Sequence, residues 1–170
     1  MKKNVISLLF FSDWLLLGVS WVMSIYAYSR LLHQMALWVS LWKREVIWTQ
    51  RSLLFFLFPV AQTIIFVLFW IAARTVFFRP LRLDRMGPGL ERDKQARLLG
   101  LKKEVAYLAL IFINLIFIHL QTSLILVSHR LGGGISKFYF IMLVGVLLIL
   151  IPYYYGRGKM LLRENRGKIS

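Results

Sequence analysis

Residues 52–73 read SLLFFLFPVAQTIIFVLFWIAA and contain no charged side chain. At about 1.5 Å of rise per residue, a helix of this length can cross a hydrocarbon core of about 30 Å. Three further apolar runs of comparable length cover residues 4–29, 105–127 and 138–155, and only Asp13 interrupts the first. A backbone in lipid must satisfy its own hydrogen bonds, and these runs do not alternate as barrel strands do, so they predict membrane-spanning helices.

The predicted fold is therefore all-α, an integral membrane four-helix bundle. The spans are expected at residues 6–29, 52–73, 105–127 and 138–155. An outer segment would cover residues 31–51, a cytoplasmic loop residues 74–104, and a cytoplasmic tail residues 156–170. We expect a single membrane domain over residues 1–170, with residues 90–104 extending the third helix inward as an amphipathic helix.

The composition agrees with this fold class and excludes several kinds of site. The chain has 170 residues, of which 59% are hydrophobic, whereas soluble domains are usually about 45–50% apolar. It contains no cysteine, which rules out disulfides, zinc–cysteine sites, iron–sulfur clusters and thiol nucleophiles. We find no Walker loop, no G-x-S-x-G elbow and no H-E-x-x-H helix, so we expect neither a catalytic residue nor a metal site.

The distribution of basic residues predicts the orientation. Sixteen of the 22 Lys and Arg residues lie before the first span, in the loop 74–104 or in the tail. By the positive-inside rule these segments face the cytoplasm, which makes the protein a multi-pass protein of the cytoplasmic (inner) membrane. Basic loops beside anionic lipids at that face account for the net charge of +15 without a nucleic-acid partner.

The outer segment, residues 31–51, is too polar to cross a membrane and too apolar to remain in water. Leu31, Met35, Trp38 and Trp42 follow a helical spacing, which predicts an amphipathic helix lying on the outer leaflet. Together with Trp48, the tryptophans also form a candidate surface for docking a partner. The two interpretations do not exclude each other.

Asp13 is the one charged residue inside a predicted span. One interpretation is a carboxylate that couples transport to a proton or cation. The other is a carboxylate near the inner interface, paired with a basic residue such as Lys2, Lys3 or Arg74.

Helix three carries the polar residues Asn114, His119 and Gln121, which commonly act as polar contacts between helices or with a partner. Gln62 of helix two is another candidate for hydrogen bonding across helices. His119 could also be an axial ligand of haem. A bis-histidine site would need a second histidine in the membrane, but His33 and His129 fall in outer loops.

Tyr28, Leu31 and the Arg51–Ser52 step resemble the SdpI-type bacterial membrane family over residues 28–73. Members carry Tyr-x-x-Leu-Pro-x-x-Ile-Pro-x-His after their first span, followed by an Asn, a Gly and an Asp. Here different residues stand at the prolines, the histidine and the three later positions, namely Leu32, Ala36, Trp38, Ser40, Lys43 and Val46. The resemblance implies a small multispan protein linked to toxin immunity and to signalling through partner binding.

These patterns favour a non-enzymatic membrane protein that acts by binding other membrane proteins or by self-association, as an accessory subunit or as an immunity or signalling protein. The first alternative is a small proton-coupled transporter that uses Asp13. The second is a haem-carrying electron-transfer subunit that uses His119.

Overall fold

The computed structural model describes residues 3–31, 33–40, 45–73, 88–131 and 134–163. In chain order the elements are α1 (Lys3–Ser29), β1 (Gln34–Val39), β2 (Val46–Gln50), the 3-10 turn η1 (Leu53–Phe56), α2 (Leu57–Ala72), α3 (Pro88–Ser128) and α4 (Lys137–Arg163). Four helical segments are long and apolar enough to cross a membrane, which confirms the four apolar spans.

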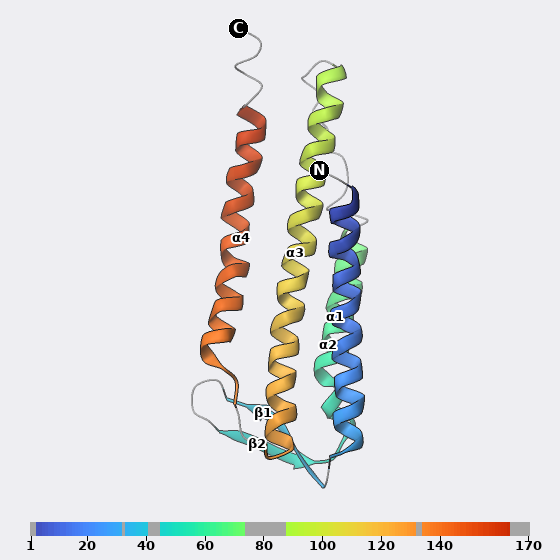
Figure 1. Ribbon diagram of the computed structural model, residues 1–170, viewed down its shortest axis with the longest axis vertical. Helices are drawn as coiled ribbons and strands as arrows, with labels where there is room; N and C mark the ends of the chain where they lie inside the picture. Colours follow the sequence, from blue (N-terminus) through green and yellow to red (C-terminus); the bar gives the residue numbers. More distant parts are fainter. Residues whose placement is uncertain (1–2, 32, 41–44, 74–87, 132–133, 164–170) are drawn as a thin grey trace.

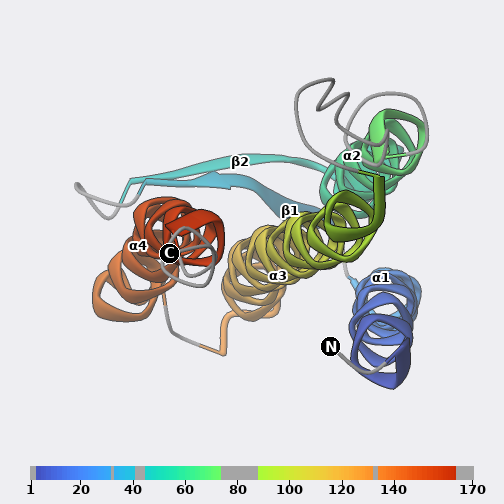
Figure 2. The same ribbon diagram turned by 90° about the horizontal axis from the view of Figure 1, so that it is seen from above.

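The four helices pack around α3 rather than around a common axis. Helices α1, α2 and α3 contact one another, whereas α4 packs against α3 on the side away from α1 (Figure 2). Helices α1 and α3 run toward the β-hairpin, and α2 and α4 run away from it (Figure 1). The start of α1 and the end of α4 therefore both lie away from the hairpin, as an even number of spans requires (Figure 1).

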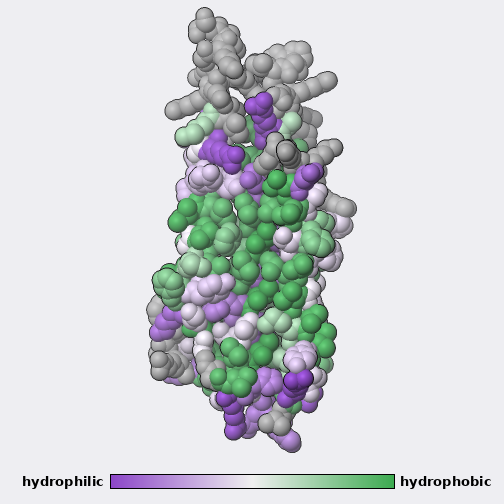
Figure 3. Space-filling model, in the orientation of Figure 1, coloured by the Kyte–Doolittle hydropathy of each residue, from purple (hydrophilic) through white to green (hydrophobic). Residues whose placement is uncertain are grey.

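The surface of the spans is apolar, as a lipid-facing surface should be. Between 11% and 28% of the residues in the most apolar 18-residue window of each span are buried within the protein, so most residues of these windows keep some exposed surface. Figure 3 shows a mostly hydrophobic middle zone, with hydrophilic residues gathered toward both ends of that face. This arrangement matches a hydrocarbon layer bounded by two polar layers.

The segment between α1 and α2 is not the amphipathic helix that the spacing predicted. The described residues form an antiparallel pair of strands, β1 and β2, so the all-α prediction was wrong here. The packing gives the reason, because Met35 and Phe55 are buried in one cluster with Ala27 and Leu31 at the end of α1. The segment also contains β-branched and aromatic residues, which are common in strands. Burial against the rest of the protein therefore outweighed the local helical spacing.

A bulge fixes which face of β1 meets α3. Ala36 pairs with Trp48 and the next pairing joins Trp38 to Ile47, so one extra residue of β1 stands unpaired between them. The extra residue lets Ala36 and Val39 share one face, where both pack in a cluster with Leu124 of α3. Trp38 and Ile47 are consequently left on the exposed side.

The third and fourth helices extend beyond their predicted spans. Helix α3 begins at Pro88, so the helical extension expected over residues 90–104 is confirmed. Helix α4 continues through residues 156–163, where a tail was expected. Residues 41–44 of the outer segment, which include Trp42, lie outside the described residues. Residues 74–87, which form the first half of the predicted cytoplasmic loop, also lie outside them.

Candidate functional site

A regular buried seam joins α1 to α3. Its residues on α1 follow alternating spacings of four and three, as in a coiled coil: Asp13, Leu17, Ser20, Ser24 and Ala27. Its buried residues on α3 fit the same register: Leu110, Asn114, Gln121 and Leu124. The polar pairs Asp13–Asn114 and Ser20–Gln121 are each separated by 101 positions, which means that the two helices run parallel and in step.

At one level of this seam, three side chains from three helices form a chain of hydrogen bonds. Gln62 of α2 donates from Nε2 to Oδ1 of Asn114 at 3.0 Å. Asn114 donates from Nδ2 to Oδ1 of Asp13, also at 3.0 Å. All three side chains have no exposed surface. This Asp13–Asn114–Gln62 triad therefore links α1, α2 and α3 in an interior where polar groups are costly to leave unpaired.

The triad leaves two buried acceptors without a hydrogen-bond partner among the described residues, Oδ2 of Asp13 and Oε1 of Gln62. The described partner of Asp13 is the amide of Asn114, not a basic side chain. Lys2 and Arg74, which were considered as ion-pair partners, lie outside the described residues. Among the described residues, Asp13 is therefore a fully buried carboxyl group, and one of its two oxygens accepts a hydrogen bond from an amide.

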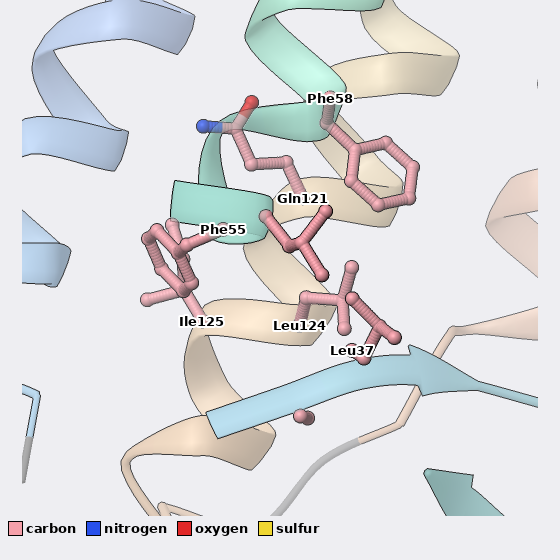
Figure 4. A pocket seen from close by; sticks show the side chains of 8 residues that line it. Leu37, Phe55, Phe58, Gln121, Leu124 and Ile125 are labelled. Carbon is pink, nitrogen blue, oxygen red and sulfur yellow. The ribbon is translucent and has the colours of Figure 1, made fainter. Parts of the chain in front are cut away.

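Two turns further along the seam, Gln121 clamps α1. Its Oε1 accepts a hydrogen bond from Ser20 Oγ at 2.6 Å. Its Nε2 donates to the carbonyl oxygen of Ser20 at 2.8 Å and to Oγ of Ser24. Figure 4 shows Gln121 beside a small cavity of about 10 Å³, lined also by Phe55 and Leu124, whose size is at the limit for one water molecule.

The structure thus places two of the predicted contact residues inside the chain. Asn114 and Gln121 are 0% and 2% exposed, and the hydrogen bonds described above connect them to α1 and α2. Gln62 forms the cross-helix bond that the sequence predicted for it. Ser20 and Ser24 were not among the predicted contact residues, although their spacing from Asp13 carried the signal.

His119 lies between α3 and α4. Its ring contacts Tyr139 edge to face, with 4.7 Å between ring centroids. Its Nε2 is buried with no hydrogen-bond partner among the described residues. His33 and His129 line a cavity at the hairpin end instead, so the structure does not bring either of them to His119. In the part of the chain that the structure describes, no cluster of three or more His, Asp or Glu side chains could hold a metal ion.

The hairpin places two of the three predicted tryptophans at the surface. Trp38 and Trp48 are 50% and 44% exposed, and Ile47, the cross-strand partner of Trp38, is 56% exposed. The amide nitrogen of Ala36 donates to Ser128 Oγ at 2.9 Å, which ties β1 to the end of α3. The exposed pair Trp38–Ile47 therefore stands on a strand pair that is anchored to the helices.

Comparison with protein-family models, curated proteins and solved structures finds no match for this chain. The resemblance of residues 28–73 to the SdpI-type family accordingly stays a prediction.

Proposed function

We propose that this chain is a non-enzymatic integral membrane protein that acts by binding other membrane proteins through its hairpin. Four apolar spans support the first part of this proposal. For the second part, we assign the hairpin to the outer face of the cytoplasmic membrane, because most of the basic residues belong to the segments at the opposite end. An accessory subunit and an immunity or signalling protein both fit this mode of action.

The observation that carries the proposal is the exposed Trp38–Ile47 pair. Tryptophan is enriched among the residues that dominate binding energy at interfaces, particularly when its side chain is held before binding. Val39 and Ala36 bury the other face of β1 against α3, so the pair is presented on a fixed support. A partner that offers an apolar pocket at the membrane surface would cover both side chains.

Site-specific photocrosslinking tests the proposal. We expect a photoreactive residue at Trp38 or Ile47 to form one defined protein adduct in intact membranes, because the partner would cover that face. The same residue at Trp14, which is 51% exposed in the middle of α1, should yield no such adduct. Mass spectrometry of the adducts is the measurement.

A matched substitution series completes this test. With the photoreactive residue at Ile47, W38A should reduce the adduct yield by at least about tenfold, since truncation of an interface anchor commonly costs 2 kcal/mol or more. W14A should leave the yield unchanged. Lipid adducts alone at Trp38 and Ile47 would contradict the proposal and assign the hairpin to the bilayer surface.

A second candidate function, proton-coupled transport, rests on the unpartnered Oδ2 of Asp13. A buried carboxyl with a free oxygen can take up and release a proton, although its exposed fraction of zero means that a path to it would have to open. For a transporter, D13N should abolish proton uptake into liposomes, whereas S12A, at a neighbouring position of α1, should not. A partner-binding protein should show no proton flux in either variant, and D13N should retain the Trp38 adduct.

A further inference from the structure

A cavity of about 410 Å³ opens at the hairpin end of the molecule, between α1, α3 and the hairpin. Its lining includes Arg30 and His33 after α1, Trp48 of β2, and His129 and Arg130 after α3. The volume falls within the range of about 300–1,000 Å³ that is typical of small-molecule sites. This cavity lies apart from the polar seam and from the Trp38–Ile47 pair.

The lining is suited to an anion. Arg30 and Arg130 each bring a guanidinium fork, the group that binds phosphate and carboxylate oxygens through two parallel hydrogen bonds. His33 and His129 add ring nitrogens that donate from one atom when neutral and from both when protonated. No carboxylate is among the described lining residues.

The backbone and nearby rings hold the arginines at the cavity. The Arg30 guanidinium lies over the Tyr26 ring, 4.2 Å from its centroid. Arg130 has a φ of 56°, and its amide donates to the carbonyl of Val127 at 2.9 Å while the amide of Leu131 donates to Leu126 at 3.0 Å. This is the left-handed cap of a helix C-terminus, where glycine is the usual residue.

The level of the cavity along the helices indicates where its ligand comes from. The candidate spans end at Ser29 and Ser128, and Arg30 and His129 are the next residues. The cavity therefore lies where hydrocarbon gives way to headgroups. Trp48 at its wall belongs to the residue type that is enriched at that boundary. Tyr26, beneath Arg30, is 57% exposed on the surface of the span, where lipid chains would pack.

We propose that this cavity binds the phosphate of an anionic phospholipid headgroup, held between Arg30 and Arg130. The histidines supply further donors, and the apolar surface beside Tyr26 receives the acyl chains. A free phosphate-bearing anion has the same recognition chemistry, but it would not use the acyl-chain surface. The site is separate from partner binding, because it uses neither Trp38 nor Ile47.

Native mass spectrometry of the purified, delipidated protein in a neutral detergent tests the site. The probes are phosphatidylglycerol, zwitterionic phosphatidylcholine with the same chains, and soluble glycerol phosphate. We expect the wild type to bind phosphatidylglycerol in preference to phosphatidylcholine. R30Q with R130Q should lower the affinity for phosphatidylglycerol at least about tenfold, as loss of hydrogen bonds between charged groups implies.

The control is R157Q with K159Q, which removes the same charge from exposed positions at the other end of α4 and should leave the preference intact. R30Q alone leaves the α3 cap unchanged and should lose at least about threefold, so the test does not depend on folding of the double variant. An unchanged preference in R30Q and R30Q/R130Q would overturn the proposal, as would an equal loss in the control. Competition by glycerol phosphate at concentrations equal to the lipid would overturn the lipid as ligand.

Discussion

The N114L variant should lose about 3 kcal/mol of unfolding free energy, a large loss for one side chain. Asn114 is the middle member of the Asp13–Asn114–Gln62 triad, so leucine removes the donor to Asp13 and the acceptor of Gln62 together. Because all three side chains are fully buried, neither partner can turn to solvent. The measurement is reversible unfolding in mixed micelles with increasing denaturing detergent.

A double-mutant cycle separates the lost pairing from a general packing defect. D13L combined with N114L removes the carboxyl that N114L leaves without its donor, so the double variant should recover more than half of the loss. T122V is the matched control on α3, because the Thr122 hydroxyl donates to the carbonyl of Ile118 in its own helix. It should change stability by less than about 0.5 kcal/mol. If the losses in D13L and N114L simply added, the triad would not be the unit described here.

The spans could be predicted because length and apolarity alone decide whether a helix crosses a bilayer. The partners of Asn114 and Gln121 could not be named in advance, because a polar residue in a span reports only that it needs a partner. The spacing of Asp13, Ser20 and Ser24 contained that information once α1 and α3 were known to run parallel.

The hairpin shows a different limit of sequence reasoning. Leu31, Met35 and Trp38 fit a helical spacing, yet Met35 is buried under α1 and Trp38 is exposed on a strand. The secondary structure of a short segment of mixed polarity depends on the surfaces against which it packs, and those surfaces belong to other parts of the chain. The cavity at Arg30 and Arg130 was missed for the same reason, since the two arginines are far apart in sequence and meet only in the fold.

The orientation of the chain in the membrane can be tested with single introduced thiols. In the proposed orientation, the hairpin lies outside the cell and the far end of α4 lies in the cytoplasm. Because the chain contains no cysteine, one introduced thiol can be labelled without background. Glu45 directly precedes β2, Lys159 belongs to the last part of α4, and both are exposed. The hairpin and the last part of α4 lie at opposite ends of the molecule (Figure 1).

Labelling of E45C and K159C with a membrane-impermeant maleimide in intact cells is thus the most direct measurement. E45C should react in intact cells, and K159C should react only after the membrane is opened. The reverse pattern would contradict the orientation. Equal labelling of both thiols, in a protein that stays monodisperse in buffer without amphiphile, would contradict the four spans themselves.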